Sequence, residues 1–197
     1  VFNNSSLIWN GCFPNLNTEI FSQIFTKYKI KKAIYSDTRG IDRTQIENNL
    51  PLKIQLLELT HQTKLPIKID YNTPETLGKD RIAGAVAAYQ AFTNSPVLII
   101  DIGTAITIDF LSANAEFKGG IISPGPETRF LSLHHFTGKL PHVKPANKTN
   151  LFGISTTQAI QFGVQNGILF EINEYILRYK QQYQNLKVIT TGGYAYL

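Results

Sequence analysis

The fold is decided by the run Val97-Leu-Ile-Ile-Asp-Ile-Gly-Thr-Ala-Ile-Thr-Ile-Asp-Phe-Leu111. Its first four residues are apolar, which predicts a buried strand. Asp101-Ile-Gly-Thr104 has the residues of a tight turn, and residues 105–111 alternate apolar and polar side chains, as a second strand does. Residues 117–123 predict a third strand. Three consecutive strands joined by short turns predict an antiparallel meander.

Helix and strand patterns surround this run on both sides. Ser155 is a candidate N-cap for a long helix, because apolar residues recur every four positions after it. The alternation of helices and strands predicts an α/β fold. The other segments are expected as helices at 19–28, 46–60 with a break at Pro51, and 81–92, as strands at 33–36, 66–71 and 187–190, and as a loop at 71–78.

The chain has 197 residues, of which 43% are hydrophobic and 17% are charged, a composition typical of globular proteins. These values exclude intrinsic disorder. No apolar run approaches the roughly 20 residues that cross a bilayer, so we expect a soluble protein with no membrane partner. A single cysteine, Cys12, favours a reducing compartment, and we expect a cytoplasmic protein. Thr93-Asn94-Ser95-Pro96 is the best candidate for a domain boundary.

The net charge of +5 raises the question of nucleic-acid binding. Residues 1–96 carry 11 basic against 8 acidic residues, a net charge of +3, and residues 97–197 carry 8 against 6, a net charge of +2. The excess is therefore spread evenly and forms no basic tail. We expect no nucleic-acid partner.

The turn Asp101-Ile-Gly-Thr104 is the first candidate for chemistry. Glycine lets the backbone approach a ligand, amide groups and the Thr104 hydroxyl can hold phosphate oxygens, and Asp101 can hold a cation. An ordinary hairpin turn uses the same residue types. The residues alone leave both interpretations open.

The second candidate is Gly78-Lys-Asp-Arg81 at a helix start. Asp80 could accept a proton from a substrate hydroxyl, and Arg81 could bind an anion. Alternatively, Asp80 caps the helix and Arg81 is a surface charge. Tyr71 is either a core aromatic residue or a pocket wall. The sequence has neither a GxxxxGK[ST] phosphate loop nor a GxGxxG fingerprint, and it has no HExxH or GxSxG motif.

Taken in order, these segments resemble the type III pantothenate kinases of the acetate and sugar kinase, Hsp70 and actin superfamily. The resemblance covers the chain from about Tyr71 to Gly193. Its motifs are Tyr71-Asn-Thr-Pro-Glu-Thr-Leu-Gly-Lys-Asp-Arg81, Asp101-Ile-Gly-Thr-Ala105, Gly119-Gly-Ile-Ile-Ser-Pro-Gly125 with Arg129, Leu140 and Pro141, then Gly153-Ile-Ser-Thr156 and Thr191-Gly-Gly193.

This resemblance implies transfer of the ATP γ-phosphate to the primary hydroxyl of pantothenate, the first step towards coenzyme A. It implies Asp80 as the general base and Asp101 as the ligand of a monovalent cation, K⁺ or NH₄⁺, with Mg²⁺ accompanying ATP. The residues implied to bind pantothenate are Tyr71, Gly78, Lys79, Asp80, Arg81 and Thr156, and those implied to bind ATP are Gly103, Thr104, Gly192 and Gly193.

The resemblance also implies an architecture. We expect two ribonuclease H-like lobes, residues 1–95 and 96–197, with a cleft between them, in a homodimer whose pantothenate pocket includes partner residues. The family's first strand and its Asp-x-Gly-Asn-Thr phosphate turn would fall just before Val1, and a few dozen residues would follow Leu197. We expect both pieces to lie outside the printed chain.

A non-catalytic regulatory or accessory binding protein on the same fold is the alternative function. A degenerate relative of that kind would keep the glycines and lose the base. Asp80, Arg81, Asp101, Thr104 and Thr156 are all present, which favours the enzyme.

Overall fold

The computed structural model describes residues 1–3, 6–11, 13, 18–37, 43–48, 50 and 54–195. The chain divides into two compact units. The first comprises residues 1–63 with 78–80, and the second comprises residues 64–77 with 81–197. This division differs from the predicted lobes 1–95 and 96–197, which stay a prediction.

The second unit contains a five-stranded mixed sheet with the strand order β5-β8-β7-β6-β9. Its centre is the predicted meander, since β6 pairs antiparallel with β7 and β7 antiparallel with β8. The two edge strands run parallel to their neighbours. The strands are β5 (Lys68–Ile69), β6 (Val97–Ile102), β7 (Ala105–Leu111), β8 (Glu116–Pro124) and β9 (Lys187–Thr191).

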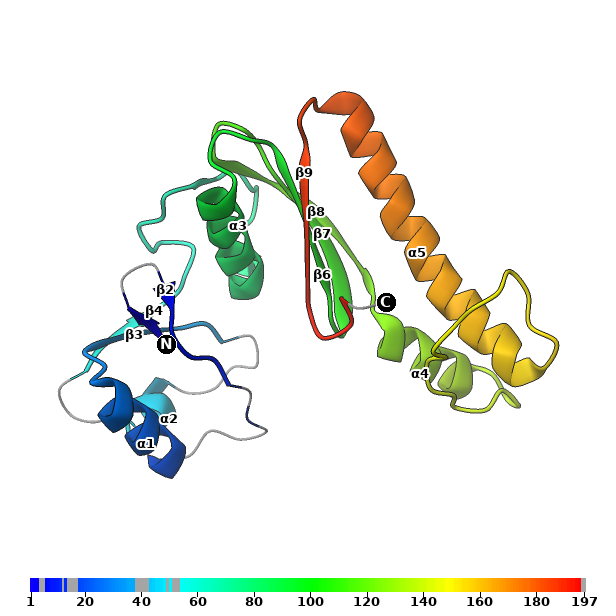
Figure 1. Ribbon diagram of the computed structural model, residues 1–197, viewed down its shortest axis with the longest axis horizontal. Coiled ribbons are helices and arrows are strands. Elements are labelled where there is room, and N and C mark those ends of the chain that lie inside the picture. Colours follow the sequence, from blue (N-terminus) through cyan, green and yellow to red (C-terminus); the bar gives the residue numbers. More distant parts are fainter. Residues whose placement is uncertain are drawn as a thin grey trace. The chain divides into compact units, whose positions relative to one another are not determined.

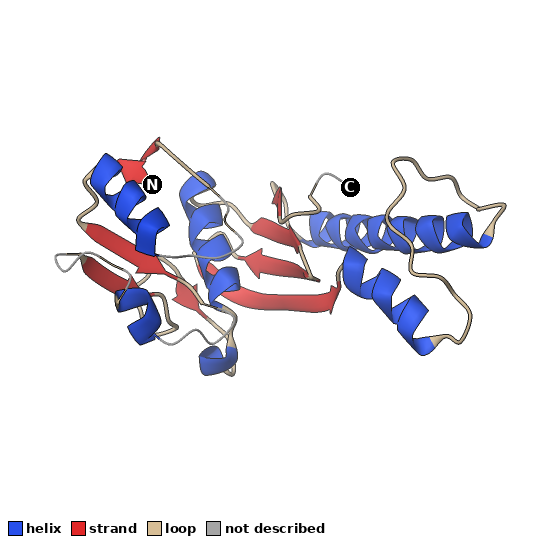
Figure 2. Cartoon of the chain, turned by 90° about the horizontal axis from the view of Figure 1, so that it is seen from below, coloured by secondary structure: helices blue, strands red, loops and turns tan. Residues whose placement is uncertain are grey.

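Helices cover both faces of this sheet (Figure 1). On one face lies α3 (Lys79–Ala91), where Gly84 sits beside the Ile99 side chain. On the other lie α4 (Pro126–Phe136) and the long α5 (Thr156–Gln182), which run beside each other (Figure 2). The Ser155 hydroxyl accepts a hydrogen bond from the Gln158 amide, so the predicted N-cap is confirmed.

The core of the second unit forms between the sheet and the α4–α5 layer. Alternate residues of β6 and β7 point into this layer, as the strand period requires. The apolar residues that recur every four positions along α5 meet them, which confirms the predicted stripe as far as Ile172. The buried cluster consists of Leu98, Ile100, Ile102, Ile106, Ile108, Phe130, Val143, Ile160, Val164, Ile168 and Ile172.

The described residues of the first unit form two small sheets and two helices. Strands β1 (Phe2–Asn3) and β2 (Ser6–Leu7) form an antiparallel pair, and β3 (Lys32–Tyr35) pairs parallel with β4 (Gln55–Glu58). The helices are α1 (Thr18–Tyr28) and the short α2 (Arg43–Glu47).

The predicted helix at 46–60 is wrong. Helix α2 ends at Glu47, and residues 55–58 form strand β4. Leu56 and Glu58 are half-buried while Gln55 and Leu57 are exposed, which is the alternation of a strand. Pairing with β3 therefore outweighs the helix preference of Gln, Leu and Glu. The predicted break at Pro51 lies outside the described residues.

Two other boundaries shift. The strand expected at 66–71 shortens to Lys68–Ile69, and the helix expected at 81–92 begins earlier, at Lys79, and ends at Ala91. Between residues 71 and 78 the loop contains one 3₁₀ turn, Pro74–Thr76. In the part of the chain that the structure describes, no helix is long and apolar enough to cross a membrane. Cys12 lies outside the described residues.

Candidate active site

The turn between β6 and β7 is held by its neighbours. The Gly103 amide donates to the Ala105 carbonyl at 3.0 Å. The Thr104 carbonyl accepts two hydrogen bonds, from the Gly125 amide at 2.9 Å and from the Thr128 hydroxyl at 2.7 Å. Thr104 itself is exposed. The backbone of the turn is therefore fixed, while the Thr104 side chain can reach a ligand.

Two glycines allow other strands to approach this turn closely. A Cβ atom on Gly125, directly after β8, would lie 2.0 Å from the Gly103 carbonyl oxygen. Gly192, directly after β9, has φ +98°, and its Cβ would lie 2.5 Å from the Asp101 carboxylate. No side chain fits at either place. The structure thus brings Asp101, Gly103, Thr104 and Gly192 together at one end of the sheet, where β6 and β9 end and β7 begins.

Asp101 contributes a carboxylate to this end of the sheet. Asp101 is half-buried, and one of its carboxylate oxygens lies against Gly192, as the Ile102 carbonyl oxygen does. Carboxylate and carbonyl oxygens are the donors that hard cations prefer. In the described ranges, no three His, Cys, Asp or Glu side chains gather as a metal-binding group. The donor atoms at Asp101 therefore fit a hard cation.

The start of α3 presents Asp80 and Arg81 differently. Successive helical residues point about 100° apart, and here Asp80 is exposed whereas Arg81 is buried. Just before them, the Lys79 ammonium pairs with the Glu58 carboxylate of β4 at 2.7 Å. Gly78 is half-buried and directly precedes the helix. The Asp80 carboxylate is thus accessible to a substrate.

Arg81 is no surface charge, because it forms a buried ion pair with Asp109 of β7. Its Nε atom lies 3.1 Å and 3.0 Å from the two Asp109 carboxylate oxygens, and its Nη2 atom donates to Oδ1 as well. Burial lowers the pKa of Arg81, but Asp109, with a smaller contribution from Tyr71, outweighs burial and raises the pKa above its ordinary value. The guanidinium stays charged inside the protein.

Aromatic rings flank this guanidinium. The Cζ atom of Arg81 lies 5.8 Å from the Tyr71 ring centroid and 5.7 Å from that of Phe117, within the range of a cation–π interaction. The Tyr71 ring packs over Gly119, where a Cβ would lie 3.3 Å from it. Tyr71 is therefore half-buried and packs beside Arg81.

Gly120 makes room for Asp109. The two residues are directly opposite each other in β8 and β7, and a Cβ on Gly120 would lie 2.4 Å from an Asp109 carboxylate oxygen and 2.1 Å from the Ile108 carbonyl oxygen. Sequence reasoning missed Asp109 as a site residue. An acidic residue within an otherwise apolar strand is the signal that could have found it.

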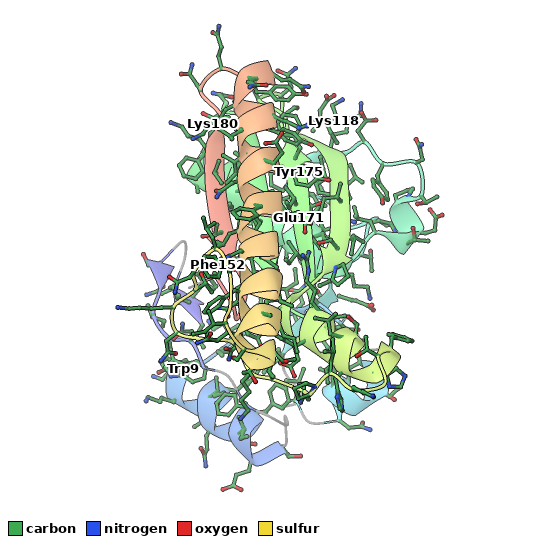
Figure 3. All side chains as sticks on the ribbon, turned by 90° about the vertical axis from the view of Figure 1, so that its right-hand side faces the viewer. Trp9, Lys118, Phe152, Glu171, Tyr175 and Lys180 are labelled. Carbon is green, nitrogen blue, oxygen red and sulfur yellow. The ribbon has the colours of Figure 1, made fainter. Side chains whose placement is uncertain are left out.

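Thr156 belongs to another element, helix α5. It is exposed at the first turn of α5, and no hydrogen bond among the described residues links it to Arg81 or to the 101–104 turn. Gly193 is exposed after β9, with open space where a Cβ would lie. The segment before Thr156 exposes large apolar side chains, including the labelled Phe152 (Figure 3).

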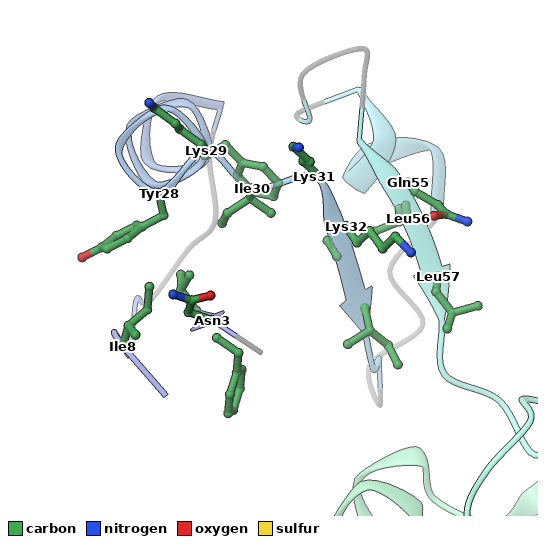
Figure 4. Close-up of a pocket in the computed structure, with 15 residues that line it drawn as sticks. Asn3, Ile8, Tyr28, Lys29, Ile30, Lys31, Lys32, Gln55, Leu56 and Leu57 are labelled. Carbon is green, nitrogen blue, oxygen red and sulfur yellow. The ribbon is translucent and has the colours of Figure 1, made fainter. Parts of the chain in front are cut away.

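A cavity lies elsewhere, within the first unit (Figure 4). It has a volume of about 1140 Å³, and its lining is mostly apolar with three lysines, Lys29, Lys31 and Lys32. None of the site residues predicted from the sequence lines it. The candidate site therefore consists of the 101–104 turn with Gly192, and of the start of α3.

Comparison with known proteins identifies relatives. A family model described as type III pantothenate kinase matches residues 16–178. Type III pantothenate kinases from Christiangramia forsetii and Cytophaga hutchinsonii are 41% and 40% identical, over 98% and 100% of this chain and 80% and 81% of their own length. That of Phocaeicola vulgatus is 35% identical over 98% of this chain and 80% of its own.

A solved structure is also similar. The structure, described as a conserved Baf family transcriptional activator from Campylobacter jejuni, superposes with a TM-score of 0.55 at 24% identity, over 87% of this chain and 73% of that one. At this identity the likeness establishes the fold alone. The family match and the relatives, which match nearly the whole of this chain, together establish more: this chain belongs to the type III pantothenate kinase family.

Proposed function

We propose that this protein phosphorylates pantothenate with ATP, giving 4′-phosphopantothenate in the first step of coenzyme A biosynthesis. Membership of the type III pantothenate kinase family supports the reaction. The observation that carries the mechanism is the exposed Asp80 carboxylate at the start of α3, directly beside the buried Arg81. No observation favours the accessory binding protein.

Asp80 is proposed as the general base. Its carboxylate takes the proton of the pantothenate hydroxyl as that oxygen attacks the γ-phosphorus of ATP. The new P–O bond forms while the bond to the β-phosphate oxygen breaks, and ADP leaves with that electron pair. Phosphoryl transfer depends mainly on alignment and charge neutralisation, so a carboxylate can serve as this base.

The 101–104 turn is proposed to bind the ATP phosphates. Gly103 and Thr104 offer an amide and an exposed hydroxyl, and Asp101 would hold K⁺ or NH₄⁺, which would neutralise phosphate charge. Mg²⁺ would come with the ATP phosphates, and no described residue is assigned to it. Gly192 and Gly193 would let the adenine approach the backbone after β9.

Pantothenate is proposed to bind at the α3 start. Arg81 suits its carboxylate, with Tyr71 as a wall and Gly78 and Lys79 nearby. Thr156 would contribute to the same pocket. The pocket would lie in a cleft between two ribonuclease H-like lobes, residues 1–95 and 96–197.

A homodimer is part of this proposal. Its support is the apolar surface around Thr156, where Leu151, Phe152 and Ile154 are 87%, 75% and 86% exposed. Contiguous exposed apolar side chains of this size are typical of interaction sites. We expect sedimentation to give twice the monomer mass, and Phe152→Asp to shift the mass towards that of the monomer.

The expected location of the protein is the cytoplasm.

The activity is tested with protein from the complete reading frame. We expect ADP release that needs pantothenate, Mg²⁺ and ATP and that rises when K⁺ or NH₄⁺ replaces Na⁺. Asp101→Asn should abolish the response to K⁺ while the protein stays folded. A folded protein without pantothenate-dependent ADP release under any of these cations would overturn the proposal.

A further inference from the structure

Asp109 satisfies one edge of the Arg81 guanidinium and leaves another. A guanidinium has a side-on edge, made by Nε and Nη2, and an end-on fork, made by Nη1 and Nη2. Both Asp109 oxygens lie on the side-on edge, bonded to Nε and Nη2. The end-on fork points away from Asp109, and Tyr71 contributes a weaker side-chain hydrogen bond to the same guanidinium. The end-on fork is the edge on which a second carboxylate can bind with two hydrogen bonds.

The surroundings fix this orientation from several sides. The side chains of Arg81 and Asp109 are only 6% and 2% exposed. Tyr71 and Phe117 flank the guanidinium, and Gly120 leaves the space that the Asp109 carboxylate fills. A long arginine side chain has many rotamers, and this enclosure selects one of them.

We propose that Asp109 is a positioning residue for substrate recognition: it holds Arg81 so that the end-on fork of the guanidinium meets the carboxylate of the substrate. The inference rests on the proposed function, because pantothenate supplies that carboxylate. Asp109 touches no reacting atom and acts through Arg81.

If only charge mattered, replacing Asp109 would tighten the binding of the substrate carboxylate. The pair has no net charge, so Asp109 reduces the attraction of Arg81 for an anion. Removing the Asp109 charge would then tighten binding. If Asp109 instead orients Arg81, its removal should weaken pantothenate binding, since bidentate recognition of a carboxylate needs donors in fixed positions. The geometry favours orientation, because both carboxylate oxygens and two flanking rings constrain the same group.

The test compares pantothenate with its primary amide, which lacks the carboxylate charge. The measured quantity is the ratio of kcat/KM for the acid to kcat/KM for the amide, which does not depend on the fraction of folded enzyme. For Asp109→Asn we expect this ratio to fall at least fivefold. We expect KM for pantothenate to rise about tenfold, with KM for ATP and kcat changed less than threefold. Asp70→Asn, at an exposed ion pair, is the matched control and should leave all four values unchanged.

Asp109→Glu is the second variant, because it keeps the ion pair and shifts the carboxylate by one methylene. We expect a smaller fall of the same ratio, about twofold or more. An unchanged ratio in both variants, or a lower KM for pantothenate in Asp109→Asn, would overturn the positioning role. If neither variant folds, the Arg81–Asp109 ion pair serves stability alone, and the positioning role is overturned as well. A wild-type enzyme without pantothenate-dependent turnover overturns the proposed function as well, so the two failures are distinguishable.

Discussion

Two arginine–carboxylate pairs in the second unit serve different purposes. Arg81 and Asp109 are enclosed in the α3 face of the sheet, with side chains 6% and 2% exposed. Arg129 of α4 and Glu171 of α5 are 22% and 23% exposed, and Glu171 is labelled on α5 in Figure 3. The buried pair fixes a side chain, whereas the half-buried pair is part of a network that fixes a backbone segment.

The half-buried network holds the end of β8. The Arg129 Nε donates to the Pro124 carbonyl at 2.7 Å, and its Nη2 reaches the Ser123 hydroxyl at 3.1 Å. That hydroxyl donates to Glu171 at 2.6 Å. Pro124 directly precedes Gly125, which packs on the 101–104 turn. Through Pro124 and Gly125, the network therefore helps to position the 101–104 turn, the candidate phosphate-binding turn.

The largest effect is expected where a buried charge loses its partner. Asp109→Ala leaves Arg81 charged in the interior, and we expect a loss of about 3–5 kcal/mol in the free energy of unfolding, measured by urea denaturation. Combining Arg81→Met with Asp109→Leu should recover most of that loss, since no unpaired charge remains. An equal loss in the single and the double variant would refute this explanation.

A smaller effect is expected from crowding the same pair. Gly120→Ala places a Cβ 2.4 Å from the Asp109 carboxylate and 2.1 Å from the Ile108 carbonyl oxygen, so we expect a loss of about 1–3 kcal/mol. Gly138→Ala is the matched control, because nothing lies within 4 Å of its Cβ. Its unfolding free energy should stay within about 0.5 kcal/mol of wild type. Similar losses in both variants would mean that the Gly120 contact is unimportant.

Breaking the half-buried network should cost less stability and affect the other substrate. For Glu171→Gln we expect a loss of about 1 kcal/mol, reduced by partial exposure of the pair. KM for ATP should rise about threefold, while the acid-to-amide ratio for pantothenate stays constant. A change in that ratio would show that the two pairs are not independent.

The smallest effect concerns the exposed cluster of Lys118 with Asp70 and Glu116, at 2.7 Å and 2.8 Å. Hydrogen bonds from Lys118 and its charge lower the pKa of both carboxyls. A carboxyl whose pKa is lower in the folded than in the unfolded state stabilises the fold at pH values above the unfolded pKa. This contribution is lost as the pH falls below about 4, where the carboxyl takes up a proton. Thermal unfolding of Lys118→Met should therefore depend slightly less on pH in this range. Because the groups are exposed, 1 M salt should remove the difference.

The sequence predicts the centre of the second unit well. The apolar run 97–100 and the alternation of 105–111 place β6 and β7, and the four-residue period after Ser155 places α5, because packing and local preference agree there. Strand β4 was missed because Gln55 to Glu58 favour a helix and only pairing with β3 makes them a strand.

The candidate site was predicted in part. Asp80, Arg81 and the 101–104 turn were proposed from their residue types and the family resemblance, and their roles stay a prediction. Asp109 and Glu171 were not, because each forms its pair with a residue 28 or 42 positions away. Only the strand register and the helix packing bring such partners together. The role of Gly120 likewise depends on its register with Asp109.

The most direct test of the central claim is formation of phosphorylated pantothenate by wild type and Asp80→Asn, followed by mass spectrometry with ATP, Mg²⁺ and K⁺. Asp80 is exposed, so both proteins should have the same melting temperature. We predict that wild type forms the product and that Asp80→Asn forms it at least about 100-fold more slowly, as expected for loss of a general base. Equal rates in the two proteins, or no product from the folded wild type, would contradict the account.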